Sequence, residues 1–393
     1  MKFLHTADWH IGIKAAHLGT AGPSVRAARI RSARGLINMA NARGVDFVLV
    51  AGDTFDDNCV APAAVREVLW ILEASSAPVY VIPGNHDWLC PGSVWERTEW
   101  GRSGKIHVLA DEKAVDIGPA VLYPCPVREP QSAADPTAWI PPAKPAAGPR
   151  GDKPRIALAH GSVEGLPQEE PDFPIPRGLA AAKGLDYAAL GHWHSFARCA
   201  GKDGVCRMAY CGAHEATRFG RSESGFACFV TISGRWSIPA IEQVPSAGLT
   251  WVDRRETVDG GDAIRAVTES LLAIGGGEST LVRVELSGVY GAGDIDALDE
   301  LRAIGDSGRF LYFELNDAGL RLVHKNILAN TGWIARIGEP LVRKTGERLA
   351  MMRGTAVDAS LSFGDGDGPE PVDRAVLDRA LRELYMIARG ASR

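Results

Sequence analysis

The first 125 residues alternate short apolar runs with longer stretches whose apolar positions recur at helical spacing. Apolar runs of this length predict buried strands, and the stretches between them predict amphipathic helices. The predicted strands are 2–7, 45–53 and 77–87, and the predicted helices are 24–44 and 62–74. Ser24 is expected to cap the first helix, Gly44 to end it, and Pro62 to begin the second. The order strand–helix–strand–helix–strand indicates an α/β fold with a largely parallel core.

Polar residues follow each predicted strand at its carboxyl end. The first three strands run into "ADWH", "GDTFDD" and "GNHD", and two later apolar runs, 155–159 and 185–190, end in "HGS" and "GHWHS". Alternation along a strand would place His192 and His194 on the same side of the chain. In parallel sheets the carboxyl ends of strands share one edge, where chemistry collects. These polar residues are therefore expected to form one cluster.

The side chains from these five strand ends offer carboxylate, imidazole and amide groups but no thiolate. They are Asp8, His10, Asp53, Asn85, His86, Asp87, His160, His192 and His194. Each alone is explained as a solvated or turn residue, but five strand ends in one architecture indicate a shared site. Such groups suit Mn²⁺, Fe²⁺ or Zn²⁺, and there are too many for one ion. Two ions about 3.5–4 Å apart that share a carboxylate would use them all, for attack of water on a phosphoryl centre.

The remainder of the chain is organised differently. Residues 245–325 have the pattern of a small α/β domain, and no polar cluster follows its predicted strands, so recognition is expected there instead of catalysis. The proline- and alanine-rich stretch 124–154 predicts a surface excursion within the first domain, 1–240. In the tail, 326–393, helical spacing of apolar residues predicts a helix near 373–389 that either packs on its own domain or docks a partner. Short strands are also predicted at 205–212, 225–232 and 235–241.

Composition narrows the class of protein. The 393 residues are 46% hydrophobic and 23% charged, which is typical of a globular protein, and no apolar run is long enough to span a bilayer. Because the start of the chain has no secretory pattern, a cytoplasmic protein with reduced cysteines is expected. The net charge of −5 argues mildly against nucleic acid as a partner, but two divalent ions would dominate the local field at a phosphate.

Five motifs, taken in order, resemble those of the calcineurin-like metallophosphoesterase superfamily over residues 1–240. They are "DWH" at 8–10, "GD" at 52–53, "GNHD" at 84–87, "HG" at 160–161 and "GHWH" at 191–194. The resemblance implies a four-layer αββα sandwich with the metals at the edge of its sheets. The smaller α/β capping domain and the C-terminal helical tail would follow this sandwich.

The same resemblance implies a role for each residue of the cluster. The first ion would be held by Asp8, His10 and His194, the second by Asn85, His160 and His192, and Asp53 would bridge the two. His86 would stabilise the transition state or protonate the leaving oxygen. Asp87 would orient and polarise His86, although a simple turn residue explains it as well.

A narrower resemblance concerns the opening "FLHTADWHIG" and the segment "AGDTFDDNCVAP", which are similar to those of SbcD-type DNA repair nucleases. Asp56 stands where some relatives have histidine. Ala213 and His214 stand where the family usually has a different pair of residues, in the loop after the last motif. The likeness implies a 3′–5′ exonuclease that prefers Mn²⁺, with single-strand endonuclease activity as a further alternative. The implied partners are DNA and a coiled-coil ABC-type ATPase of the SbcC kind. A second copy of this chain is an open alternative.

A DNA substrate would need phosphate and base contacts. Arg218 and Arg221 follow the last motif and are candidates for phosphate, while Trp193 either stacks on a base or packs beneath its loop. Four further arginines on the first predicted helix could contact phosphate, but they are better explained as residues of a solvated face. They are Arg26, Arg29, Arg31 and Arg34. Two other functions stay open: a phosphodiesterase for cyclic nucleotides or other small diesters, and a non-catalytic scaffold that tethers DNA.

Overall fold

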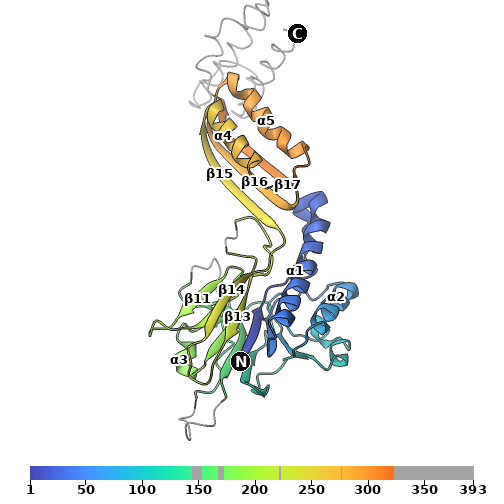
Figure 1. Cartoon of the computed structure of the whole chain (residues 1–393), viewed down its shortest axis with the longest axis vertical. Helices are drawn as coiled ribbons and strands as arrows, with labels where there is room; N and C mark the ends of the chain where they lie inside the picture. Colours follow the sequence, from blue (N-terminus) through green and yellow to red (C-terminus); the bar gives the residue numbers. More distant parts are fainter. Residues whose placement is uncertain (144–152, 167–171, 221–222, 276, 323–393) are drawn as a thin grey trace, which may run out of the picture. The chain divides into compact units, whose positions relative to one another are not determined.

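The computed structural model describes residues 1–143, 153–166, 172–220, 223–275 and 277–322. The chain divides into two compact units, Met1–Trp251 and Val252–Arg393, which are described separately (Figure 1). The first unit holds two six-stranded sheets, and the second holds a three-stranded sheet with two helices.

The first sheet of the first unit has the strand order β14-β13-β1-β2-β3-β4. Its strands are β1 (Lys2–Thr6), β2 (Phe47–Ala51), β3 (Val79–Ile82), β4 (Ile106–Val108), β13 (Phe226–Thr231) and β14 (Ala240–Pro245). Strands β1 to β4 are parallel, whereas β13 pairs with β1 and β14 pairs with β13 in antiparallel fashion. The predicted parallel core is confirmed, and it brings the carboxyl ends of β1, β2 and β3 to one edge.

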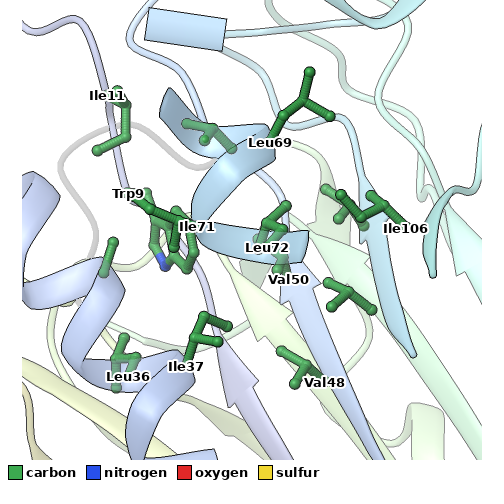
Figure 2. Close-up of a cluster of buried hydrophobic side chains, with 14 of the residues drawn as sticks. Trp9, Ile11, Leu36, Ile37, Val48, Val50, Leu69, Ile71, Leu72 and Ile106 are labelled. Atoms are coloured by element: carbon green, nitrogen blue, oxygen red, sulfur yellow. The ribbon is translucent and has the colours of Figure 1, made fainter. Parts of the chain in front are cut away.

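Two helices, α1 (Gly22–Ala42) and α2 (Pro62–Glu73), cover one face of this sheet. Figure 2 shows Leu36 and Ile37 of α1 and Leu72 of α2 over Val48 and Val50 of β2. The predicted start of the second helix at Pro62 is confirmed, and the left-handed Gly44 lies just beyond α1 as expected. The predicted cap at Ser24 is wrong, because α1 already begins at Gly22 with a proline in its first turn.

The second sheet has the order β11-β12-β10-β7-β6-β5 and lies face to face with the first. Its strands are β5 (Val115–Asp116), β6 (Val121–Cys125), β7 (Arg155–His160), β10 (Tyr187–Gly191), β11 (Ala197–Ala200) and β12 (Cys206–Tyr210). Phe47 and Leu49 of β2 pack between the sheets against Leu158 and Tyr187. On the outer face lies α3 (Leu179–Lys183). Helices, sheet, sheet and helix therefore follow one another in layers, and the mixed α/β prediction is confirmed.

Two further predictions concern segments that connect strands of the first unit. Strands β6 and β7 are adjacent and parallel, so the stretch 124–154 joins neighbouring strands of one sheet, as expected of an excursion. The strand predicted at 235–241 is wrong over most of its length, because Trp236 has a φ of 67° and Ser237 donates a turn hydrogen bond to Gly234. The short elements are η1 (Ala16–Ala21), η2 (Val94–Glu96), η3 (Trp100–Arg102), β8 (Ser162–Val163) and β9 (Pro174–Ile175).

The second unit has the predicted order of strands and helices. Its elements are β15 (Thr250–Asp259), α4 (Gly261–Leu272), β16 (Gly277–Tyr290), η4 (Ala292–Asp294), α5 (Ile295–Asp306) and β17 (Phe310–Leu322). Leu271 of α4 and Leu298 of α5 share an apolar core with Val282 and Val284 of β16. The helix predicted near 373–389 lies outside the described residues. No helix within the described ranges is both long and apolar enough to cross a bilayer.

Candidate metal centre

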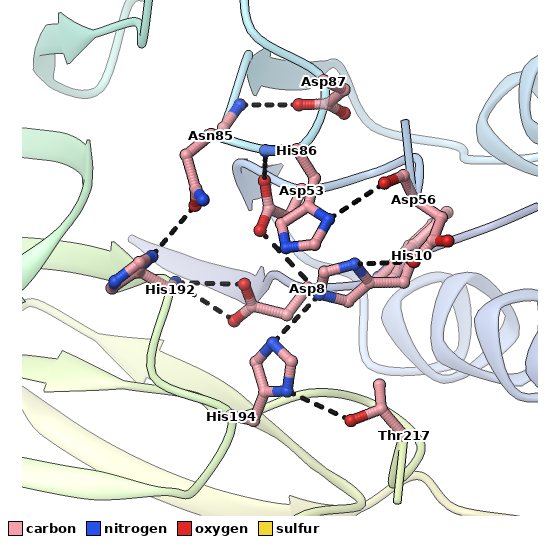
Figure 3. Close-up of polar contacts among 12 residues, drawn as sticks. Asp8, His10, Asp53, Asp56, Asn85, His86, Asp87, His192, His194 and Thr217 are labelled. Atoms are coloured by element: carbon pink, nitrogen blue, oxygen red, sulfur yellow. Dashed lines mark hydrogen bonds and ion pairs between the residues drawn. The ribbon is translucent and has the colours of Figure 1, made fainter. Parts of the chain in front are cut away.

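The polar residues that follow the strands of both sheets meet at one place in the first unit (Figure 3). The loop after β1 contributes Asp8 and His10, that after β2 contributes Asp53, and that after β3 contributes Asn85 and His86. From the second sheet, β7 ends at His160, and the loop after β10 contributes His192 and His194. All seven predicted ligands therefore lie in one cluster, because the carboxyl ends of the parallel strands face the same side.

One group within the cluster consists of Asp8, His10 and His194, whose ligand atoms lie within 4.8 Å of one another. The Nε2 atoms of His10 and His194 are 3.0 Å apart. Two nitrogen ligands bound about 2.1 Å from one ion at a right angle would be separated by about 3.0 Å. This spacing suits a shared cation.

A second group is centred on the side-chain oxygen of Asn85. This oxygen lies 2.8 Å from Nε2 of His160 and 3.0 Å from Nδ1 of His192. One carboxylate oxygen of Asp53 lies 3.3 Å from Nε2 of His160 and 3.8 Å from Nε2 of His10. Asp53 thus lies between the two groups, as a bridging carboxylate must.

The hydrogen bonds of His160 test whether these residues fit a metal. Its Nδ1 lies 2.8 Å from the carbonyl oxygen of Ala51 and must carry a proton to bond there. In the neutral ring, Nε2 then presents a lone pair to the oxygens of Asp53 and Asn85. Three lone pairs that face one another are unfavourable unless a proton or a metal cation lies among them, so this set of groups fits a divalent metal ion.

Electrostatics within the cluster shift the pKa values in opposite directions. Burial opposes ionisation of Asp53, but the charge and hydrogen bond of His160 outweigh it and hold the pKa of that carboxyl below its usual range. Burial lowers the pKa of His160, yet the Asp53 charge more than compensates and raises that pKa to about 9. For His192, burial and then the charge of His160 lower the pKa to about 4. Without a metal, the cluster therefore keeps a proton on His160, where a cation would otherwise lie.

The backbone of the cluster is strained. Asp8, His10, Asp53 and His192 have φ values of 55°, 44°, 49° and 95°, in the left-handed region that favours glycine. Such strain in non-glycine residues is typical of functional sites. His192 and His194 both lie beyond the end of β10, so strand alternation does not apply to them. His192 faces Asn85 and His194 faces His10, in agreement with their predicted assignment to separate groups.

Two glycines allow the loops to approach so closely. Gly52 has a φ of 87°, and a Cβ atom there would lie 2.3 Å from Nδ1 of His160. A Cβ atom on Gly84 would lie 2.2 Å from a carboxylate oxygen of Asp53. A larger side chain at either position would displace a ligand.

His86 lies at the open side of the cluster, with an exposed ring. Its Nδ1 is 2.9 Å from the carbonyl oxygen of Asp56, and its backbone N–H donates to a carboxylate oxygen of Asp53 over 2.9 Å. Burial lowers the pKa of His86, but the Asp53 charge and the bond to Asp56 raise it above its ordinary value overall. The ring is also close enough to His10 and Asp53 to form a third group that could hold a metal.

Asp87, the next residue after the exposed His86, is fully buried. Its two oxygens accept hydrogen bonds from the backbone N–H groups of Gly84, over 2.7 Å, and Phe55, over 3.0 Å. Among the described contacts, the partner of the His86 ring is the Asp56 carbonyl. Asp87 therefore joins the loop after β3 to the loop after β2.

The structure describes two of the three predicted DNA contacts, Trp193 and Arg218. Trp193 is half-buried and packs against the outer apolar core of the second sheet, and Arg218 is exposed. Arg221 lies outside the described residues. Trp9, within the first motif, is fully buried and its indole N–H donates to the Thr6 hydroxyl. Arg29 is 1% exposed, so the prediction that it contacts phosphate and the prediction that it lies on a solvated face are both wrong.

Three contacts of the cluster were missed from the sequence. The Asp56 carboxylate lies 3.5 Å from Nδ1 of His10, and the Thr217 hydroxyl lies 3.3 Å from Nδ1 of His194. Arg29 donates to the carbonyl oxygen of Asp8. Only Arg29 carried a signal, because helical spacing places it on the buried face of α1 with Val25 and Leu36.

Comparison with known proteins finds similarity to metal-dependent phosphoesterases. A family model described as calcineurin-like phosphoesterase matches residues 1–196. The chain is 29% identical over 219 residues to the uncharacterized metallophosphoesterase YhaO of Bacillus subtilis, a match that covers 49% of this chain and 48% of YhaO. It is 27% identical over 298 residues to the SbcD component of the nuclease SbcCD of the same organism, covering 64% of this chain and 68% of that protein.

A shorter match links the chain to the DNA double-strand break repair protein Mre11 of Archaeoglobus fulgidus. The two are 31% identical over 91 residues, which cover 22% of this chain and 19% of Mre11. The chain thus spans about half of YhaO and less of Mre11, so these similarities concern part of each relative.

Proposed function

We propose that this chain, whose residues 1–196 match the calcineurin-like phosphoesterase family, is a two-metal hydrolase that cleaves phosphodiester bonds in DNA. The observation that carries the proposal is the position of Asp53 between two groups of ligand atoms, 3.3 Å from His160 and 3.8 Å from His10. A carboxylate in this place can be shared by two cations.

The proposed ligand sets follow the two groups. Asp8, His10 and His194 would hold one ion, Asn85, His160 and His192 would hold the other, and Asp53 would be shared by the two. Mn²⁺ is the proposed ion, with Fe²⁺ and Zn²⁺ as chemically suited substitutes. When bound, such a pair activates water and neutralises the charge of the phosphoryl group.

His86 is the proposed proton donor to the leaving oxygen. Its Nδ1–H is held by the carbonyl of Asp56, which leaves Nε2 to face substrate from an exposed ring. The Asp53 charge and the bond to Asp56 raise the pKa of His86 above its ordinary value despite partial burial, which favours the protonated ring. Asp87 holds the backbone that presents this ring.

Similarity to the SbcD component of the nuclease SbcCD supports DNA as the substrate, because it covers 64% of the chain, more than the 196 residues of the matched domain. In this proposal Arg218 and Arg221 bind phosphates and Trp193 stacks on a base. Cleavage is 3′–5′ exonucleolytic, with an endonuclease activity on single strands. A coiled-coil ABC-type ATPase is the proposed partner, docked by the helix near 373–389.

The test uses the full chain, stripped of metal and reloaded with Mn²⁺. End-labelled duplex and single-stranded DNA are incubated beside bis(p-nitrophenyl) phosphate, a small diester. We expect Mn²⁺-dependent shortening of DNA that disappears in Asp53→Asn and persists in Asp57→Asn, a neighbouring acid whose carboxylate caps Cys59.

Two results would contradict the proposal. Hydrolysis of the small diester with intact DNA would indicate a phosphodiesterase for small molecules. Bound Mn²⁺ with neither substrate cleaved would indicate a DNA-tethering scaffold.

A further inference from the structure

Arg29 of α1 is a buried cation that joins two loops at the metal centre. Its Nε and Nη2 donate to the carbonyl oxygens of Asp8 and Trp9, over distances of 2.6–3.3 Å. Its Nη1 donates to the carbonyl oxygens of Glu215 and Ala216, both over 3.1 Å. All five N–H groups of the guanidinium thus have an acceptor, as a buried charge requires. The backbone that carries Asp8 is thereby fixed relative to residues 215–216.

The segment Ala213–Thr217, here called the positioning loop, also contacts the loop that carries His194. The backbone N–H of Ala213 donates to the carbonyl oxygen of His194 over 2.9 Å. Ala213 also forms a parallel bridge with Ala7, directly before Asp8. The Thr217 hydroxyl lies 3.3 Å from Nδ1 of His194, whose Nε2 faces His10. Figure 3 shows this run of contacts. Because Nδ1 is engaged, Nε2 is the nitrogen left to bind a metal.

The positioning loop is itself held by hydrogen bonds from two of its buried side chains, His214 and Glu215. His214 is buried, and its Nε2 bonds to the carbonyl oxygen of Arg29 over 2.9 Å. One carboxylate oxygen of the buried Glu215 accepts hydrogen bonds from the Ser32 hydroxyl and the Gly248 N–H, both over 2.5 Å. The loop is therefore held by α1 on one side and holds ligand-bearing backbone on the other.

We propose that the positioning loop and Arg29 set the geometry of one metal position, the one held by Asp8, His10 and His194. This inference rests on the proposed two-metal function. Arg29 and Thr217 are positioning residues, since they touch ligands and their backbone, not the reacting atoms. Among the described contacts of Arg29 and Thr217 with proposed ligands, all involve this group. Thr217 contacts His194 of this group, so its loss should affect this ion and spare the other. Arg29 bonds the backbone of Asp8, whose carboxylate also lies near Asp53 and His160.

The decisive test compares Thr217→Val, which keeps the shape but removes the hydroxyl, with Thr217→Ser, which keeps the hydroxyl. Metal-free full-length protein is titrated with Mn²⁺ by calorimetry. Wild type is expected to bind two equivalents. Thr217→Val should bind one of them about 10–100-fold more weakly and the other unchanged, because contacts behind the ligands tune metal affinity by that factor. Thr217→Ser should restore the wild-type curve.

Cobalt provides a second readout that does not depend on activity. The visible spectrum of the Co²⁺-loaded protein reports ligand geometry, and it should change in Thr217→Val but not in Thr217→Ser. Arg29→Met should weaken the same position, with Arg31→Met, on the exposed face of α1, as its matched control. The melting temperature of each variant, measured without metal, shows that the compared proteins are folded.

The outcomes separate this inference from the function it rests on. A wild type that binds fewer than two Mn²⁺ ions overturns the two-metal centre and this inference together. A wild type that binds two ions, with Thr217→Val identical to it in affinity and Co²⁺ spectrum, overturns only the positioning role.

Discussion

The Nδ1 atom of His86 lies 2.9 Å from the backbone carbonyl oxygen of Asp56, a bond that turns Nε2 toward the open side of the metal centre. Replacement of His86 by alanine should lower nuclease turnover about 10²–10⁴-fold, the usual contribution of a positioned proton donor. Mn²⁺ binding should be unchanged, because His86 is not one of the proposed ligands. Turnover on end-labelled DNA and calorimetric Mn²⁺ titration measure the two effects.

His107 provides the control for this variant. It is an exposed histidine on β4, whose ring stacks on Tyr80 at a centroid distance of 5.0 Å. His107→Ala should keep both turnover and metal binding. Loss of one Mn²⁺ equivalent in His86→Ala would instead identify His86 as a ligand of the third group, with Asp53 and His10.

Metal should stabilise the folded protein through Asp53. An ion that binds only the folded state at about 100 times its Kd adds about 2.7 kcal/mol to the free energy of unfolding. The melting temperature of wild type should therefore rise when Mn²⁺ replaces EDTA. Asp53→Asn should lose most of this rise, because it removes the charge that both ions share.

Asp57 lies in the same loop and is half-buried, but its carboxylate accepts a local hydrogen bond from the N–H of Cys59. Asp57→Asn keeps an oxygen there and should keep the full Mn²⁺-dependent shift. An equal shift in Asp53→Asn would argue against a shared carboxylate and favour two independent ions.

The position of the site was predictable because it follows from topology. Parallel strands share the edge at which they end, so polar residues after β1, β2 and β3 had to meet. The backbone conformation of the loops did not follow from the strand pattern. His192 lies beyond the end of β10 with a φ of 95°, a conformation that no periodicity rule anticipates.

The contacts around the ligands could not be predicted for a different reason. Thr217 reaches His194 and Arg29 reaches Glu215 across large sequence separations. No local pattern encodes such pairs, since each member alone has the appearance of a surface residue. The register of α1 did place Arg29 on an apolar face, yet only the tertiary structure supplies the carbonyl acceptors that make its burial tolerable.

Asp87 should stabilise the fold through the two loops it joins. Asp87→Ala leaves the buried N–H groups of Gly84 and Phe55 without acceptors, and each such loss costs about 1–3 kcal/mol. The free energy of unfolding should therefore fall by about 2 kcal/mol or more, as measured by urea denaturation in EDTA. Asp87→Asn keeps one oxygen and should lose roughly half as much.

An exposed aspartate serves as the comparison. Asp203 accepts a hydrogen bond from the N–H of Val205 in a surface turn. Asp203→Ala should change stability by less than about 0.5 kcal/mol. Equal stability of Asp87→Ala and wild type would indicate that Asp87 is a simple turn residue.

His5 of β1 connects the two sheets and should make stability depend on pH. Its Nε2 lies 3.2 Å from the carbonyl oxygen of Leu190 and its Nδ1 lies 3.0 Å from the hydroxyl of Tyr187. Burial lowers the pKa of His5 from 6.5 to about 3, although the bond to Leu190 opposes this shift. The folded state thus binds fewer protons than the unfolded state between these values.

The sign follows from this difference in protonation. The contribution of His5 is fully present above the unfolded pKa and is lost as the pH falls below it, by about 1.4 kcal/mol per pH unit. Between about pH 7.5 and pH 5.5, wild type should therefore lose about 1.4 kcal/mol more stability than His5→Gln. Urea unfolding in EDTA at both pH values measures it, with His107→Gln expected to follow wild type. Parallel losses in wild type and His5→Gln would show that this buried ring does not control the acid sensitivity of the fold.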